Sequence, residues 1–145
     1  MKKYFFPLIL AITIVCSFQI KAEAEIPKPT KDSEQLRLQD IFMLMLYPYI
    51  KEELTKYYSP ILKTYSPDIE LWKVEVIETK RVNDFRGFIL DITFDIEPSA
   101  AHHVSIGKDR MTYRISYGPE VRLLNHTHLK TYKLPSDIQD SVQRE

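Results

Sequence analysis

The histidines are the residues whose spacing comes closest to a chemical motif. All four lie between residues 102 and 128, and a single residue separates His126 from His128. On a strand, side chains two positions apart point to the same face, so one metal ion could bind both imidazoles. Further ligands would have to come from His102, His103 or a carboxylate. A helical His-Glu-x-x-His motif is absent, and four solvated or half-exposed histidines explain the pattern equally well.

Other catalytic chemistry has less support. Asp109 with one of the histidines is the acid–base pair that would suit a hydrolase or an isomerase. No Gly-x-Ser-x-Gly elbow surrounds a serine, and the single cysteine, Cys16, lies in an N-terminal apolar run. Residues 107–110 lack the glycine spacing of a phosphate loop. We therefore assign no catalytic residue and no cofactor, and the sequence favours a protein that is not an enzyme.

Charged residues near predicted turns are candidates for ligand recognition. We expect Arg86, Asp109 and Arg110 to form an exposed ligand-binding patch, although each is equally suited to stabilising a turn. A row of acidic and hydroxyl side chains also alternates along one predicted strand. We interpret this row as the solvated face of a sheet rather than a calcium or acid–base site. It consists of Asp91, Thr93, Asp95 and Glu97.

The charge balance excludes one class of partner. The chain has 145 residues, of which 20 are Lys or Arg and 20 are Asp or Glu. Nucleic-acid-binding proteins usually carry a strong excess of clustered basic residues. Here the longest basic run outside the N-terminal region is Lys80-Arg81. We therefore predict no nucleic-acid partner.

The first residues have the features of a secretory signal peptide, which we assign to residues 1–24. Lys2 and Lys3 precede an apolar run over residues 4–20, and an Ala-Glu-Ala cleavage pattern ends at Ala24. Cleavage there would leave a mature chain without cysteine, either secreted or on the cell surface. The protein would contact a membrane only if this leader stays uncleaved.

A helical pattern follows. Asp32 is the expected N-cap, with Gln35 completing a capping box. Apolar residues at helical spacing continue past Pro48, where the helix must either kink or restart. Two Tyr-Ser-Pro triplets, at residues 58–60 and 65–67, end the helical part, because the residue before proline disfavours helical geometry.

Alternating apolar residues then predict antiparallel strands. The clearest runs cover residues 72–77, 88–97 and 111–117. Matching the apolar faces of the first two runs places Val74 opposite Phe94. A last strand starts near residue 121, but its inward face is undefined, because Leu123 and Leu124 point in opposite directions.

Together these elements predict an α+β fold in one domain. Residues 25–31 contain two prolines and three charges and are expected to form a flexible tether, so the domain covers residues 32–145. N-terminal helices would pack on a four-stranded antiparallel curved sheet. The element order is that of cystatin-like and NTF2-like cones, a fold class that hosts enzymes, inhibitors and binding modules.

The chain also resembles a family of small exported proteins of bacilli, catalogued as domain of unknown function 3888. The resemblance covers residues 34–134 and implies an exported protein of a Gram-positive bacterium, without any activity to carry over. It rests on Leu38-Gln39-Asp40-Ile41-Phe42-Met43, Tyr47-Pro48-Tyr49-Ile50, Tyr57-Tyr58, residues 81–89, residues 105–112, Gly118-Pro119-Glu120-Val121 and His128-Leu129.

The missing catalytic motifs favour an exported, non-enzymatic binding domain. Its partner would be an extracytoplasmic protein, a wall component or a small ligand bound between helices and sheet. Two alternatives stay open. One is a metal-binding protein that uses His126 and His128, and the other is a cone-fold hydrolase or isomerase that uses Asp109.

Overall fold

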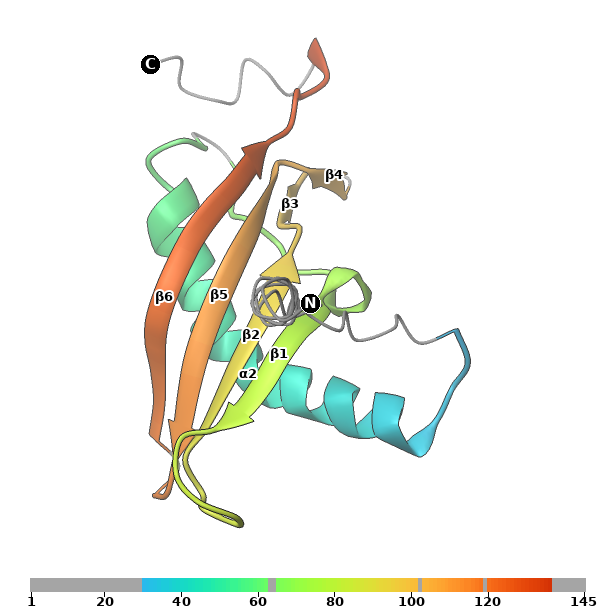
Figure 1. The fold of residues 1–145 in the computed structure, drawn as a ribbon. Coiled ribbons are helices and arrows are strands. Elements are labelled where there is room, and N and C mark those ends of the chain that lie inside the picture. The colour runs from blue at the N-terminus through green and yellow to red at the C-terminus, as the bar shows by residue number, and fades with distance from the viewer. Residues whose placement is uncertain (1–29, 63–64, 102, 119, 137–145) are drawn as a thin grey trace, which may run out of the picture.

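The computed structural model describes residues 30–62, 65–101, 103–118 and 120–136, and shows a long helix beside a twisted antiparallel sheet (Figure 1). The predicted signal peptide, most of the predicted tether and His102 lie outside the described residues. The elements in chain order are α2 (Glu34–Tyr58), the short 3-10 helix η1 (Leu71–Lys73), β1 (Glu75–Arg81), β2 (Leu90–Ile96), β3 (Ser99–Ala100), β4 (Val104–Ser105), β5 (Gly107–Ser116) and β6 (Glu120–Thr131).

The helix α2 is capped by Ser33 rather than by the predicted Asp32. The Ser33 hydroxyl oxygen accepts a hydrogen bond from the Leu36 N–H at 3.1 Å. α2 continues through Pro48 and bends along its length (Figure 1). Pro48 removes the donor for the carbonyl of Leu44, and both residues are exposed, so water can bind the freed oxygen. The helix therefore continues as one bent element and does not restart.

The four long strands form one antiparallel sheet in the order β1-β2-β5-β6, and α2 crosses one face of it (Figure 1). The predicted alternation is confirmed in the two central strands, whose inward side chains are buried against the helix. Burial of these apolar side chains is the main force holding helix and sheet together. The central residues of this core are Met43, Leu46, Ile50 and Leu54 of α2, Ile92, Phe94 and Ile96 of β2, and Met111 and Tyr113 of β5.

The register predicted for β1 is wrong. Val76, not Val74, lies opposite Phe94, and the pairing shifts by one residue at Ile77, which forms a bulge. Trp72 lies in η1 rather than in a strand, and 72% of its surface is exposed. A 3-10 turn does not preserve the alternation of a strand. The even spacing between Trp72 and Val76 therefore does not place their side chains on the same face of the sheet.

Two bulges in β6 explain why its inward face was undefined. The pairing of β5 with β6 shifts near Leu124 and again near Leu129. The first shift reverses the alternation, because an extra residue turns the following side chains to the other face. Leu123 before this bulge and His126 and His128 after it are therefore all partly buried.

The outer face of the sheet is less solvated than the acidic row suggested. Asp91 forms a two-bond ion pair with Arg114, with N–O distances of 2.8 and 3.0 Å. Asp95 pairs in the same way with Arg110, at 2.6 and 3.1 Å. The guanidinium groups cover both carboxylates, and both aspartates are buried. The interpretation of these two residues as solvated is thus corrected.

The predicted α+β class with a four-stranded antiparallel sheet is confirmed. The expectation of N-terminal helices is wrong, because the described residues contain a single long helix and it lies mid-chain. The helical spacing of apolar residues on both sides of Pro48 fits one bent helix and two separate helices equally well. Within the described residues, no helix is long and apolar enough to cross a membrane.

Candidate functional site

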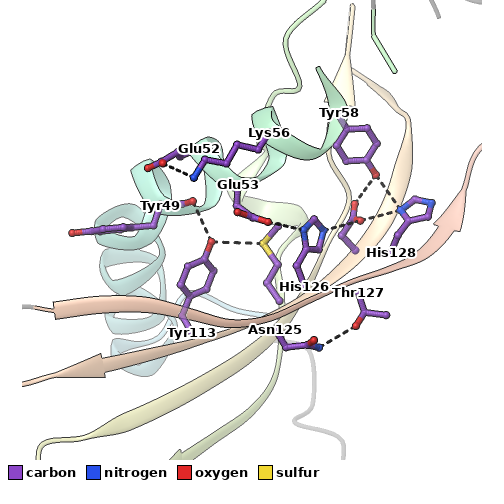
Figure 2. Close-up of polar contacts among 12 residues, drawn as sticks. Tyr49, Glu52, Glu53, Lys56, Tyr58, Tyr113, Asn125, His126, Thr127 and His128 are labelled. Atoms are coloured by element: carbon purple, nitrogen blue, oxygen red, sulfur yellow. Dashed lines mark hydrogen bonds and ion pairs between the residues drawn. The ribbon is translucent and has the colours of Figure 1, made fainter. Parts of the chain in front are cut away.

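Asp109 of β5 is the centre of the most unusual polar cluster in the described chain. Its side chain is fully buried, on the sheet face that α2 covers. The Tyr58 hydroxyl donates to Oδ2 at 2.6 Å. The Oδ1 atom lies 2.9 Å from Nδ1 of His128 and 3.1 Å from Nε2 of His126. Three side chains from α2 and β6 thus converge on one carboxylate (Figure 2).

His126 bridges this carboxylate to the helix. Its second nitrogen, Nδ1, lies 3.3 Å from Oε1 of Glu53. Only the imidazolium can donate from both nitrogens, so two carboxylate neighbours favour the charged form of the ring. Burial by itself lowers the pKa of His126, but the hydrogen bonds to Asp109 and Glu53 outweigh burial and raise this pKa above its ordinary value.

The same contacts decide the charge of Asp109. Burial tends to raise the pKa of this carboxyl, whereas hydrogen bonds from His126, Tyr58 and His128 stabilise the carboxylate, so the pKa falls below its ordinary value. Burial, together with the bond to Asp109, raises the pKa of the Tyr58 hydroxyl. The cluster therefore holds an ionised Asp109 facing a neutral phenol and a charged imidazole.

His128 extends the cluster towards the surface. Its Nε2 atom lies 2.8 Å from Oγ1 of Thr131, so a carboxylate, an imidazole and a hydroxyl follow one another in a row. The Tyr57 ring stacks on the imidazole, with centroids 5.5 Å apart and planes at 27°. The other nitrogen of His128 faces Asp109, so the surroundings fix the ring on both sides.

Gly107 leaves the space that the cluster needs. A Cβ atom at this position would lie 2.7 Å from the Tyr58 hydroxyl, 2.8 Å from the Lys130 carbonyl oxygen and 2.9 Å from Cε1 of His128. Such distances are shorter than van der Waals contact, so any side chain here would displace the cluster. Gly107 lies in the regular strand β5, and close packing is the reason a glycine is needed there.

A groove with a volume of about 350 Å³ lies beside the cluster, between α2 and β6. Glu52 and Lys56 form an ion pair at 2.6 Å on its helical wall. The Tyr113 hydroxyl donates to the Tyr49 carbonyl oxygen at 3.1 Å, which ties the wall to the sheet. Figure 2 shows these side chains together with Glu53 and His126. The groove is lined by Tyr49, Glu52, Glu53, Lys56, Tyr113, Val121, Arg122 and Leu123.

The predicted ligand-binding residues do not form a single exposed patch. Asp109 is buried. Arg110, its neighbour, points to the other face of the sheet and binds Asp95. Arg86 lies between β1 and β2, exposed and with a positive φ of 62°. Because strand neighbours point to opposite faces, the prediction of one shared patch is corrected, and only Asp109 belongs to the cluster.

The predicted metal ligands, His126 and His128, are brought together as their spacing indicated. Both turn a ring nitrogen to Asp109. His103 is elsewhere and lies 2.8 Å from a carboxylate oxygen of Glu70. No group of three or more His, Cys, Asp or Glu in the described part of the chain is arranged to hold a metal ion.

Two members of the cluster were not predicted from the sequence. Tyr58 and Glu53 lie on α2, more than fifty residues from their partners on β5 and β6. Tyr58 continues the inward spacing of Leu54, which is a signal that sequence analysis could have used. Glu53 lies three residues after the inward-facing Ile50, so the same spacing placed it beside the inward face of the helix.

The family described as "Protein of unknown function (DUF3888)" matches residues 38–130, which is more than half of the chain. The chain therefore belongs to the DUF3888 family. The DUF3888 match runs from α2 into β6 and so includes Glu53, Tyr58, Asp109, His126 and His128. No curated protein and no solved structure shows significant similarity to the chain.

Proposed function

We propose that this DUF3888 protein is an exported, non-enzymatic binding domain whose ligand occupies the groove between α2 and β6. One contrast carries the proposal. The polar atoms of Asp109 and both ring nitrogens of His126 are hydrogen-bonded within the chain, whereas the groove beside them is open. A cluster whose polar atoms already bond to one another is best explained by a structural role. An open groove with aromatic and charged walls is best explained by ligand binding.

The groove walls suit a ligand with both apolar and polar groups. Tyr49 offers ring surface, and Val121 and Leu123 offer aliphatic surface. Lys56 is paired with Glu52 at the rim, and Arg122 adds a positive charge on the β6 side. These properties support an extracytoplasmic protein, a wall component or a small ligand as the partner, with no cofactor.

Location and fold family are part of the same proposal. The signal-peptide pattern of residues 1–24 and the absence of cysteine from the rest of the chain support secretion or cell-surface display by a Gram-positive bacterium. A helix crossing one face of an antiparallel sheet supports a cystatin-like or NTF2-like cone. Both folds are compatible with a binding module.

The proposal is tested by titrating the isotope-labelled protein with cell-wall muropeptides, extended peptides and amphiphilic small molecules while recording amide NMR spectra. We expect one class to shift signals of groove residues, and Tyr49→Ala to weaken its binding at least about tenfold. Trp72→Ala removes a larger exposed aromatic side chain outside the groove and should leave affinity unchanged. Equal affinity of the two variants, or shifts confined to other surfaces, would refute the proposal.

The row formed by Asp109, His128 and Thr131 favours a hydrolase as the second candidate. A carboxylate that orients an imidazole towards a hydroxyl is the arrangement used to activate an oxygen nucleophile. The test is turnover of an activated ester such as p-nitrophenyl acetate. A hydrolase predicts a rate at least about a hundredfold above background that is lost in Thr131→Ala, and an unchanged rate in that variant would exclude this candidate.

A further inference from the structure

The strand β6 forms one edge of the sheet. The strand order β1-β2-β5-β6 pairs it with β5 on one side, and no described strand pairs with its other side (Figure 1). An edge strand presents a row of N–H and C=O groups without strand partners. Glu120–Thr131 is also the longest strand described, so this edge is a large template for hydrogen bonding.

The groove runs along the regular part of this edge. Glu120 to Leu123 pair with β5 without interruption, and the first bulge follows at Leu124. Val121, Arg122 and Leu123 from the same stretch line the groove. The helical wall of α2 therefore stands beside the segment of β6 whose backbone geometry is undisturbed.

We propose that the groove binds an extended peptide segment of a partner protein, which pairs with Glu120–Leu123 of β6 and continues the sheet. This inference rests on the proposed binding function and names its ligand class. A strand added here would direct every second side chain towards α2 and into the groove. Backbone hydrogen bonds to β6 would supply affinity, and the groove would select side chains.

The groove chemistry indicates which peptides fit. Val121 and Leu123 provide an apolar floor, so apolar side chains at alternate positions of the peptide would be favoured. The charges on the helical wall are already neutralised, since Glu52 faces Lys56 and Glu53 faces His126.

The Asp109 cluster ties this side of the sheet to α2. Glu53 and Tyr58 of α2 contact His126, Asp109 and His128 directly, and these contacts fix the distance between helix and β6. A groove of constant width loses little conformational entropy when a ligand binds. The cluster thus acts as a positioning device for the neighbouring peptide site.

A second copy of the chain is a less suitable occupant. Pairing of β6 with β6 would need a long regular edge, whereas bulges at Leu124 and Leu129 interrupt this strand. Bulged edges are one means by which proteins resist pairing with themselves. A short stretch of four regular residues suits a peptide better than a sheet of two copies.

The experiment selects twelve-residue peptides from a random displayed library against the folded protein and then measures amide hydrogen exchange with the best binder. We expect selected peptides to share an apolar-x-apolar pattern, and bound peptide to slow exchange of those amides in Glu120–Leu123 that point away from β5 at least about tenfold. The edge strand β1 is an internal control and should not change.

Matched variants distinguish strand addition to β6 from binding in the groove without strand pairing. Tyr49→Ala should weaken peptide binding at least about tenfold, and Trp72→Ala should not. Peptides that depend on Tyr49 without protecting β6 amides would overturn strand addition while leaving the groove as a binding site. Failure to select any binding peptide would also overturn strand addition. So would protection of β6 amides that appears only as the protein concentration rises, because that result would indicate pairing with a second copy of the chain.

Discussion

At the scale of single residues, Asp109 is the most consequential side chain described. A buried carboxylate is costly unless charged and hydrogen-bonding partners surround it. Here Tyr58, His126 and His128 provide those partners, and they come from two elements. The cluster therefore couples the charge state of one residue to the docking of α2 on β6.

Replacing Asp109 with asparagine should destabilise the protein by about 3–5 kcal/mol, because it removes one partner of a buried charge network. His126 would keep a charge facing only Glu53. Urea denaturation measures the free energy of unfolding. Asp40→Asn, at an exposed position of the same protein, is the control and should change stability by less than about 0.5 kcal/mol. If Asp109→Asn lowered the free energy of unfolding no more than the control does, the cluster would not contribute to stability.

The cluster also predicts a pH dependence of stability. The pKa of His126 is raised in the folded protein, so its stabilising contribution is complete below the ordinary value of 6.5 and is lost as pH rises through the folded pKa. The pKa of Asp109 is lowered, so its contribution is present above 3.8 and is lost as pH falls through the folded pKa. Unfolding free energy should therefore fall on both sides of this range.

Urea midpoints measured between pH 3 and pH 10 test this dependence. The alkaline decline that begins above pH 6.5 should be reduced in His126→Gln. The variant His103→Gln changes a histidine outside the cluster and should keep the decline. An identical profile in the His126 variant and the unaltered protein would contradict the assignment of the charged ring.

A metal site at His126 and His128 stays a prediction. Both rings already face Asp109, so a metal ion would have to replace those hydrogen bonds. If such a site exists, zinc should raise the melting temperature through binding to the folded state, and His128→Ala should abolish that rise. A rise of equal size in the variant, or none in the unaltered protein, would remove the metal alternative.

At the scale of secondary-structure elements, irregularities decide which side chains meet. The bulge at Leu124 brings Leu123 to the same face as His126 and His128, although their sequence positions differ in parity. Without this bulge the two histidines and the groove floor would lie on opposite faces of β6. One extra residue therefore makes the cluster and the groove neighbours.

Close packing of β5 on the cluster gives an element-scale prediction. Gly107→Ala should destabilise the protein by about 1–3 kcal/mol, because the added methyl group overlaps Tyr58, His128 and the backbone of β6. The combination with Tyr58→Phe removes the nearest contact and should cost less than the sum of the two single changes. Thermal or urea unfolding of the three variants measures this, and strict additivity would contradict the packing argument.

At the scale of the whole molecule, α2 packs on one face of the four-stranded sheet, and β6 is an edge strand of that sheet within the described residues. The two-bond ion pairs Asp91–Arg114 and Asp95–Arg110 cover part of the other face. Exposed apolar side chains also lie outside the groove, among them Leu38, Met45 and Trp72. The groove differs from these positions because it is a hollow bordered by both α2 and β6.

The proposed export predicts the mass of the protein in its natural setting. Intact-mass measurement of protein recovered from the surface and medium of the producing cells should give a chain that starts at Glu25, because the Ala-Glu-Ala pattern ends at Ala24. Cytoplasmic protein from the same cells serves as the reference for the uncleaved form. Full-length chain on the cell surface would instead indicate a membrane-anchored domain.

Sequence periodicity by itself determined the local features of this protein. The inward faces of β2 and β5 followed from alternation, and the shared face of His126 and His128 followed from their two-residue spacing. These features depend only on repeat distances along one segment. The sequence also limited the helix at Pro48 to two outcomes, a kink or a restart, because the effect of proline on a helix is local.

Only the tertiary structure decided how distant segments meet. The burial of Asp109 depends on Tyr58, 51 residues earlier, and the bridge from His126 depends on Glu53, 73 residues earlier. The bulges at Ile77 and Leu124 depend on the partner strands and leave no mark in local periodicity. Side-chain direction repeats within an element, whereas contact between elements is set by packing of the whole core, and that is why the site emerged only from the fold.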